Sequence, residues 1–391
     1  MSEKDLELKA LARRLMWKMG FSTRVDVQMR SYVPVRPRGS RSGYESYTDL
    51  DVLGIAFSPG FQSQRVIFDC KTTKSGSTER MFWLRGLADF FEADMAYMLR
   101  SKAVTDSARQ LAGRLQLGAL LPADVEEMES LHRIPLDLTT GPLSQLFNPE
   151  AIALHLERVN RTDQNLQPLM EYINFDYWVY DSYRNITQMV AHLSDVRRTL
   201  NPDNPRHLGI FFDCIWLYLV SCSRAIEYVR VTHISEVDLN LQAYLFGGQV
   251  GLREKQQLAS RMRALVGEDG GVLPEWYPKL LELTGRLIRN PTLFPAALRY
   301  SEWLNYSLTS ENPVSVRNAF GHSAHPTAAK LVADVAGFLV AASGIKPSFR
   351  QAARSFVIDD FISGGADHFP GQAPLPFGEV PEHGPNQAPQ V

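Results

Sequence analysis

The 391-residue sequence has only three cysteines, and none of them belongs to a CxxC pair. Cys70, Cys214 and Cys222 therefore supply neither a disulfide framework nor the four ligands of a structural zinc site. This scarcity favours a reducing compartment, and we expect the protein to be cytoplasmic.

The sequence also lacks the segments that direct a chain into a membrane. Residues 1–15 alternate acids and bases and contain no apolar signal core. The most apolar run, 209–222, is short for a membrane span and contains Asp213. We therefore predict a soluble protein without membrane contact, in which 209–222 forms a buried helix.

A strong excess of one charge is missing as well. The formal net charge is −2, so any affinity for nucleic acid must come from a local basic surface. Apolar residues make up 45% of the chain, which is ordinary for a globular protein. A chain of this length is expected to form two domains.

Apolar periodicity predicts an α/β domain over residues 1–130. The expected elements alternate between helical spacing and the period of two that is typical of a half-buried strand. In chain order they are a helix at 5–19, strands at 23–33, 48–57 and 65–73, a helix at 81–91, a strand at 93–101, a helix at 105–116 capped by Thr105 or Asp106, and a short strand at 117–122. This order predicts a sheet of mixed direction covered by helices.

The pattern changes after about residue 130. Residues 131–148 have the composition of a linker, and from 149 to 363 almost every segment has helical spacing. We therefore expect an all-α domain after the α/β domain. The tail, 364–391, is rich in proline and glycine and is expected to be disordered.

Two aspartates and a lysine on the expected strands have a pattern that suggests chemistry. Asp51 and Asp69 lie on consecutive strands joined by a turn, and Lys71 projects from the same strand face as Asp69. A carboxylate on an apolar strand is costly to bury unless it is paired or bound to metal. Hydrolysis of a phosphodiester needs a divalent cation on oxygen ligands and a group that orients water. The alternative is an ordinary salt bridge between Asp69 and Lys71.

With these residues, the first third of the chain resembles the PD-(D/E)XK superfamily of restriction-endonuclease-like nucleases. The matching segments are TDLDVLG around Asp51 and IFDCKTT around Asp69, and the α-β-β-β-α-β order also matches, although no proline precedes the first acid. The resemblance implies that Asp51, Asp69 and the backbone carbonyl of Cys70 bind Mg²⁺ or Mn²⁺. It also implies that Lys71 positions the attacking water.

Other members of this metal site stay open. Relatives often add a glutamate from the first helix, for which Glu7 is the best placed candidate and Glu3 the weaker one. Asp49 competes with Asp51 because TDLD presents two acids on one strand face, and the apolar neighbours of Asp51 favour it. Asp69→Asn is expected to stabilise the metal-free protein by relieving repulsion between the acids.

Basic residues on both sides of the acidic cluster are candidates for contacts with a phosphate backbone. They are Arg36, Arg38, Arg41, Lys74, Arg80 and Arg85. Solvated surface charge is the alternative for each of them. No helix-turn-helix, zinc finger or stacking array is recognisable, so no target preference is predicted.

A second motif lies in the helical region. Arg317, Asn318 and His322, in SVRNAFGHSAH, resemble the R-x(4–6)-H signature of HEPN-type helical ribonucleases, and the resemblance extends over about 291–345. It implies metal-independent RNA cleavage across a dimer, with the 2′-hydroxyl as nucleophile. We favour the alternative, in which Arg317 and Asn318 cap or bridge helices and His322 lies at the start of one.

Together these patterns favour an Mg²⁺-dependent DNA endonuclease whose helical domain serves sensing, homodimer formation or docking of a protein partner. This layout is similar to that of prokaryotic restriction and anti-phage defence effectors. Two alternatives stay open. One is a HEPN-type ribonuclease, and the other is an interaction protein on a catalytically silent nuclease fold.

Overall fold

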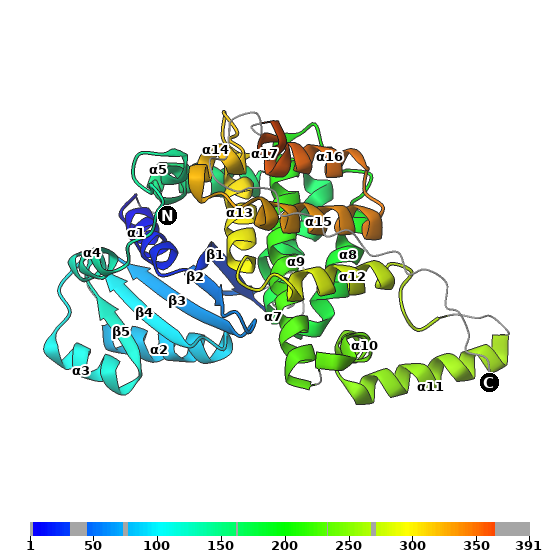
Figure 1. Cartoon of the computed structure of the whole chain (residues 1–391). Helices are drawn as coiled ribbons and strands as arrows, with labels where there is room; N and C mark the ends of the chain where they lie inside the picture. Colours follow the sequence, from blue (N-terminus) through cyan, green and yellow to red (C-terminus); the bar gives the residue numbers. More distant parts are fainter. Residues whose placement is uncertain are drawn as a thin grey trace, which may run out of the picture.

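The computed structural model describes residues 3–31, 45–72, 77–161, 163–232, 234–266 and 271–363. A five-stranded mixed sheet with its helices is followed by a larger, mostly helical region (Figure 1). The expectation of an α/β part followed by an all-α part is therefore confirmed at this level.

The sheet contains its strands in chain order, β1-β2-β3-β4-β5. Their bounds are β1 Ser22–Arg30, β2 Ser46–Phe57, β3 Ser63–Lys71, β4 Met95–Arg100 and β5 Leu117–Leu120. The first three strands are antiparallel neighbours, whereas β4 pairs parallel to β3 and β5 parallel to β4. Each parallel pair is joined through a helix, as a parallel connection requires.

Helices cover both faces of this sheet (Figure 1). On one face lie α1 (Glu3–Lys18) and α4 (Pro122–Leu131), and on the other lie α2 (Ser77–Phe90) and α3 (Asp106–Arg114). Gly54 on β2 allows the close approach of α1, because a Cβ there would lie 2.6 Å from the sulfur of Met16. Thr105 caps α3, since its hydroxyl accepts from the backbone N–H of Ala108 at 3.3 Å.

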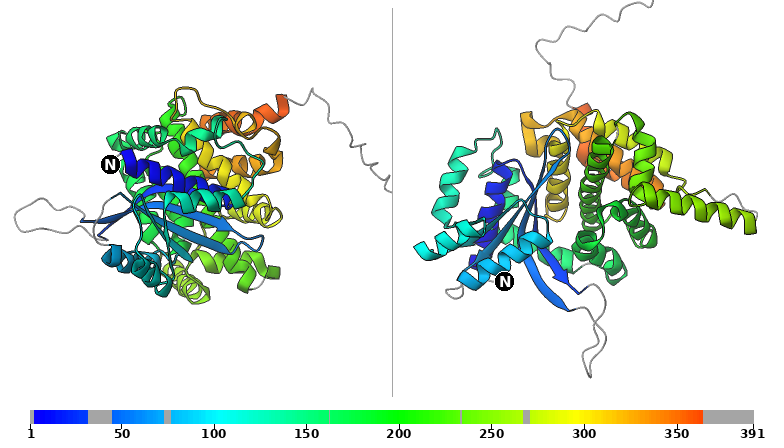
Figure 2. Two further views of the ribbon diagram at one scale, coloured as in Figure 1. Left: turned by 90° about the vertical axis from the view of Figure 1, so that its left-hand side faces the viewer. Right: turned by 90° about the horizontal axis from the view of Figure 1, so that it is seen from below.

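The helical region is built around α9, a helix of 28 residues whose central part is buried (Figure 1). The α-helices of this region are α5 Pro149–Asn160, α6 Gln167–Glu171, α7 Tyr177–Val179, α8 Asn185–Asp195, α9 Pro205–Thr232, α10 Val237–Leu245, α11 Gln249–Val266, α12 Tyr277–Ile288, α13 Phe294–Ser307, α14 Val316–Phe320, α15 Pro326–Ser343, α16 Ser348–Arg354 and α17 Asp360–Ser363. Short 3₁₀ and π segments join them: η1 Pro142–Phe147, η2 Gln164–Leu166, η3 Tyr172–Asp176, η4 Ser182–Arg184, η5 Ile234–Glu236, η6 Gly321–Ser323 and η7 Ser355–Asp359. Only α11 projects far from the other described helices (Figure 2).

Two helices are long and apolar enough to cross a membrane by length and composition alone, α9 and α15. In their most apolar stretches, 89% and 56% of the residues are buried within the protein. A core helix of a soluble protein has the same length and composition, so this is weak evidence for a membrane. The prediction of a buried helix over 209–222 is confirmed.

The last strand, β5, ends at Leu120, before the boundary expected near residue 130, and helical segments follow it. Residues 131–148, expected as a linker, contain η1, whose Leu143, Leu146 and Phe147 are buried. One hydrophobic core runs across the boundary, from Trp17 on α1 to the last helices of the chain. The tail at 364–391 lies outside the described residues.

A buried carboxylate, Glu302 on α13, joins the two parts. It accepts hydrogen bonds from the side chains of Arg13 at 2.8 Å and Trp17 at 2.9 Å, both on α1. On β1 it accepts from the Ser22 hydroxyl at 2.6 Å and from the backbone N–H and hydroxyl of Thr23. These bonds hold α1, β1 and α13 together, so the helical region is fixed against the edge of the sheet.

Candidate active site

Three aspartates lie side by side on the first three strands. The β1–β2 register pairs the residues on either side of Asp26 with those on either side of Asp51. The β2–β3 register runs up to Val52–Phe68, which makes Asp69 the next residue opposite Asp51. Asp51 is 5% exposed and Asp69 only 1%. The three carboxylates therefore form a row across the sheet in the order Asp26, Asp51, Asp69. One gap in this row lies between Asp26 and Asp51, and the other lies between Asp51 and Asp69.

The strands β2 and β3 part at this row. Beyond Val52–Phe68, β2 continues along β1 to Ser46, while β3 continues along β4 to Lys71. The side chain of Asp51 bridges the opening, because its Oδ2 accepts a hydrogen bond from the backbone N–H of Cys70 at 2.7 Å. An N–H and a C=O of one strand residue point to the same edge, so the carbonyl of Cys70 faces the opening too.

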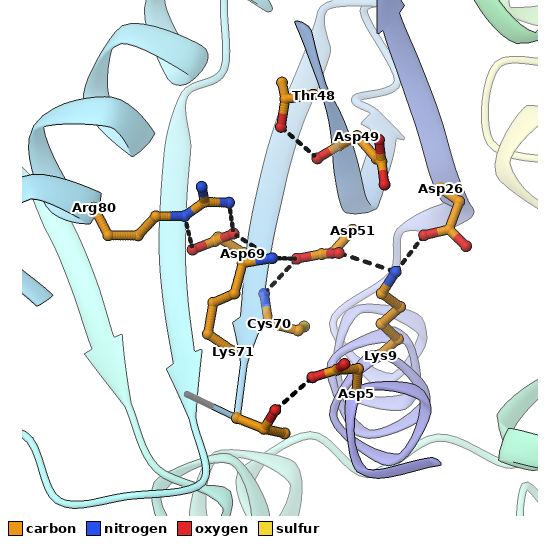
Figure 3. Close-up of polar contacts among 11 residues, drawn as sticks. Asp5, Lys9, Asp26, Thr48, Asp49, Asp51, Asp69, Cys70, Lys71 and Arg80 are labelled. Atoms are coloured by element: carbon orange, nitrogen blue, oxygen red, sulfur yellow. Dashed lines mark hydrogen bonds and ion pairs between the residues drawn. The ribbon is translucent and has the colours of Figure 1, made fainter. Parts of the chain in front are cut away.

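Lys71 lies in the gap between Asp51 and Asp69 (Figure 3). Its Nζ is 3.6 Å from Asp51 Oδ2 and 3.7 Å from Asp69 Oδ1, which is beyond hydrogen-bond distance. The side chain is 36% exposed. The structure therefore brings together the three residues expected to be catalytic, with a loosely held ammonium group between the two acids.

Lys9, from α1, fills the gap between Asp26 and Asp51 (Figure 3). Its Nζ lies 2.9 Å from Asp51 Oδ1 and also bonds Asp26 Oδ1. Asp26 has a left-handed backbone with φ of 57°, a conformation that aspartate tolerates better than most residues. This backbone twist within β1 accompanies the contact between Asp26 and Lys9.

Burial and neighbouring charge shift the pKa values at this row in different directions. Burial lowers the pKa of Lys9, but Asp51 and Asp26 more than offset this effect, and the net pKa is raised. Burial also raises the pKa of Asp26, which the Lys9 ammonium partly counteracts. The pKa of the fully buried Cys70 thiol lies well above its usual range because of burial and the nearby acids. Lys9 is therefore a firmly charged group, and the thiol is not a nucleophile.

Asp26, Asp51 and Lys71 face a cavity of about 450 Å³ between the sheet and the helical region, whereas the buried Asp69 does not line it. From the sheet side, Asp5, Lys9, Asp26, Asp49, Asp51 and Lys71 line it. From the helical region come His155, Asn174, Asp213, Trp216, Asn305 and Tyr306. Acidic side chains outnumber basic ones among all the lining residues, six to three, so the cavity attracts cations.

The helical wall of this cavity is rigid. Arg24 on β1 holds both carboxylate oxygens of Asp213 on α9, at 2.7 and 3.1 Å, and also bonds Asn174. The ring of Tyr306 stacks on His155 with centroids 3.7 Å apart, and the guanidinium of Arg13 lies over Tyr306 at 4.1 Å. Together with Glu302, these contacts fix the shape of the cavity.

Several expected site residues lie elsewhere. Glu7 is exposed and is two positions from both Asp5 and Lys9, so it lies on another side of α1. Asp5 is the acid that α1 brings to the cavity, where it accepts from the Thr72 hydroxyl at 2.8 Å. Asp49 is exposed at the mouth of the cavity, which favours Asp51 as the first acid. The side chain of Glu3 lies outside the described residues.

The six basic residues expected to contact phosphates differ in their surroundings, and four of them cannot be placed. Arg36, Arg38, Arg41 and Lys74 lie outside the described residues. Arg80 holds both oxygens of Asp69, with distances of 2.6 and 2.9 Å, and stacks on Trp83. Arg85 pairs with Asp89 on the surface of α2. Arg80 is thus joined to the acidic row, whereas Arg85 is a solvated helix charge.

The HEPN-like residues lie on the surface of the helical region. Arg317, Asn318 and His322 are all exposed, on the five-residue helix α14 and on η6. Arg317 bonds the carbonyl of Gly321 at 3.5 Å, and Asn318 bonds Asp360 at 3.4 Å. These contacts match the bridging role that the sequence favoured, and none of the three residues lines the cavity described above.

Comparison with known proteins gives this chain no relative. No family model, curated protein or solved structure matches it. The function must therefore be inferred from the chemistry of the acidic row, and the resemblance to PD-(D/E)XK nucleases stays a hypothesis.

The acidic row fits a magnesium ion of the kind that the resemblance implies. Within the described residues, no group of three or more His, Cys, Asp and Glu side chains is arranged to hold a metal ion. Mg²⁺, however, binds through one or two carboxylates together with waters and substrate phosphates. Each ionised carboxylate has about four lone-pair sites, and Arg80 uses two of those on Asp69. On Asp51, the backbone N–H of Cys70 and the Nζ of Lys9 occupy two lone-pair sites. Both carboxylates therefore keep lone-pair sites for a cation, and the Cys70 carbonyl faces the same opening.

Two residues of this site were not identified from the sequence, Asp26 in the row and Lys9 beside it. Each of the three aspartates stands between two apolar residues, as VDV, LDV and FDC. The repetition of this pattern on three consecutive strands is the signal that could have identified Asp26. Lys9 had no such signal, because helical spacing alone does not reveal which strand residues α1 covers.

Proposed function

We propose that this protein is a magnesium-dependent endonuclease that hydrolyses phosphodiester bonds in DNA. The observation that supports this best is the pair of buried aspartates at the point where β2 and β3 part, with Lys71 between them. The strand order and the helix on each face of the sheet are those that the resemblance to PD-(D/E)XK nucleases implies. The acidic cavity is also in keeping with a metal-dependent enzyme. Its negative charge attracts a cation, and a bound cation would reduce its repulsion of the phosphate backbone.

The residues of the row have separate tasks in this proposal. Asp51, Asp69 and the Cys70 carbonyl would hold the cation, and a cation bound there would lower the pKa of a water and polarise the phosphate. The backbone N–H of Cys70 fixes the Asp51 carboxylate, and Arg80 fixes that of Asp69. Lys71, whose side chain is 36% exposed and loosely held, would donate a hydrogen bond to the attacking water and offset charge on the phosphate.

The helical region closes one side of the cavity and presents a large further surface. We propose that it serves oligomerisation or the docking of a partner protein, in a restriction or anti-phage defence effector. This assignment rests on the analogy of layout, in which a nuclease domain precedes a helical module.

A cleavage assay tests the proposal. Plasmid DNA and a structured RNA are each incubated with the full chain, in Mg²⁺ and in EDTA. We expect DNA cutting that requires Mg²⁺ and is lost in Asp69→Ala and Lys71→Ala. Lys4→Ala, an exposed lysine on α1, is the matched control and is expected to cut normally.

Two other results would overturn the proposal. RNA cutting that survives EDTA and is lost in His322→Ala would favour the HEPN-type ribonuclease instead. Metal-dependent cutting that is unaffected by Asp69→Ala and Lys71→Ala would place the active site elsewhere in the chain.

A further inference from the structure

The two gaps in the aspartate row hold two ammonium groups of very different mobility. We propose that Lys9 is a permanent cation in the gap between Asp26 and Asp51, so that the site takes up one divalent ion, between Asp51 and Asp69. This inference rests on the proposed metal-dependent activity. Lys9 is then a positioning residue that replaces a second metal ion.

The contacts of Lys9 make it hard to displace. The residue is 4% exposed, and its Nζ reaches carboxylate oxygens on both β1 and β2. Removal of this ammonium leaves the buried Asp51 and the partly buried Asp26 facing each other without a cation, which is unfavourable. A divalent ion entering this gap would have to expel a buried, doubly paired charge.

The helix that carries Lys9 is itself fixed. Arg13, one turn further along α1, is fully buried and donates to Glu302 on α13 at 2.8 Å. Trp17, a further turn along, donates to the same carboxylate at 2.9 Å. Because α1 is anchored on both the sheet and α13, Lys9 cannot leave the row by a shift of its helix.

Lys71 differs on each of these points. Its Nζ is 3.6 and 3.7 Å from the nearest acid oxygens, and its side chain is 36% exposed. Lys71 is the last residue of β3 and lies at the opening where β2 and β3 part. Both acids are buried, but the ion pairs are long and the lysine that makes them is partly exposed, so they cost less to break than those of Lys9. An entering cation therefore displaces Lys71 and leaves Lys9 in place.

The test is the number of Mn²⁺ ions bound per chain, measured by calorimetric titration of the full chain and by the loss of free-Mn²⁺ EPR signal. We expect one ion for the wild type, for Lys9→Arg, which keeps the cation, and for the control Lys4→Met. We expect two for Lys9→Met, because the acids of Asp26 and Asp51 are then open to a second ion. A residue with a merely structural role would not raise this number when it is replaced.

Lys9→Met places two acids together without a cation, so its melting temperature is measured with and without Mn²⁺. We expect it to melt below the wild type without metal and to gain more from Mn²⁺ than the wild type does. Lys9→Gln keeps a hydrogen-bond donor at the same position and replaces Lys9→Met where the latter does not fold. It is also expected to bind two ions.

The outcomes separate this inference from the proposed function. Two ions in the wild type, or one ion in the folded neutral Lys9 variants, would overturn the role of Lys9 while metal-dependent cutting stands. No Mn²⁺ binding and no cutting by the wild type would overturn both.

Discussion

The guanidinium of Arg80 holds both carboxylate oxygens of Asp69, with Nη2 2.6 Å from Oδ1 and Nε 2.9 Å from Oδ2. Arg80 also lies over the ring of Trp83, 3.4 Å from its centroid, which limits where the guanidinium can go. Two parallel hydrogen bonds to a planar carboxylate fix its orientation as well as its charge. Asp69 is therefore held in one orientation at the opening between β2 and β3 before any cation binds.

This pair reverses the expected effect of Asp69→Asn. Sequence reasoning placed Asp69 next to another acid and expected its neutralisation to stabilise the metal-free protein. The structure surrounds Asp69 with Arg80 and Lys71, so we expect the variant to lower the free energy of unfolding by about 1–3 kcal/mol. Urea denaturation in EDTA measures this, and a variant that is more stable than the wild type would contradict the account.

Arg80 and an entering cation compete for the same oxygens of Asp69. We therefore expect Arg80→Gln to bind Mn²⁺ about fivefold more tightly, equivalent to roughly 1 kcal/mol, the worth of a partly exposed ion pair. Calorimetric titration gives the affinity, with Arg85→Gln on the same helix as the control. Weaker binding by Arg80→Gln would mean that its orienting effect outweighs the competition.

Glu302 is expected to be essential for stability although it lies outside the acidic row. Its carboxylate is buried and accepts from Arg13, Trp17, Ser22 and Thr23. Glu302→Gln leaves the buried Arg13 without a counter-charge and turns an amide N–H toward other donors. We expect a loss of about 3–5 kcal/mol in the free energy of unfolding.

The exposed Glu311→Gln is the matched control for this measurement and is expected to change stability very little. A loss of less than about 1 kcal/mol for Glu302→Gln would contradict the view that this carboxylate joins the helical region to the sheet.

His207 makes stability depend on pH. Burial lowers its pKa, with Asp163 opposing, and its Nδ1 accepts from the backbone N–H of Asn201 at 3.1 Å. The neutral ring is thus favoured in the folded state. Its contribution is complete above the unfolded pKa of about 6.5 and is lost as the pH falls through the lowered folded value.

We therefore expect the free energy of unfolding to fall between pH 8 and pH 5.5, and His207→Gln to reduce this fall. Chemical denaturation at several pH values measures both. An identical slope for the wild type and His207→Gln would show that this ring does not titrate on unfolding.

Local pattern predicted much of the sheet and part of the site. Alternation placed β1, β2 and β3 to within a few residues, and the i, i+2 spacing correctly put Asp69 and Lys71 on one face. Residue type narrowed the cap of α3 to Thr105 or Asp106, and the structure shows that it is Thr105. These features depend on neighbours in the chain, which is why the sequence contains them.

The remainder depends on contacts between distant segments. Lys9 reaches Asp51 only because α1 crosses the sheet at one particular angle, and Glu302 meets Arg13 from 289 positions away. The position of Glu7 shows the same limit, since helical spacing fixes which residues share a face but not which face meets the acids. No local pattern of spacing or polarity carries this information.

The most direct test of the central claim is cleavage of plasmid DNA by Lys71→Ala, compared with the wild type in Mg²⁺. Lys71 is half-exposed and makes only long ion pairs, so its loss should leave the melting temperature almost unchanged. We predict that cleavage falls by at least about 100-fold while Mn²⁺ is still bound. Cleavage at the wild-type rate by this folded, metal-binding variant would contradict the assignment of the active site to the opening between β2 and β3.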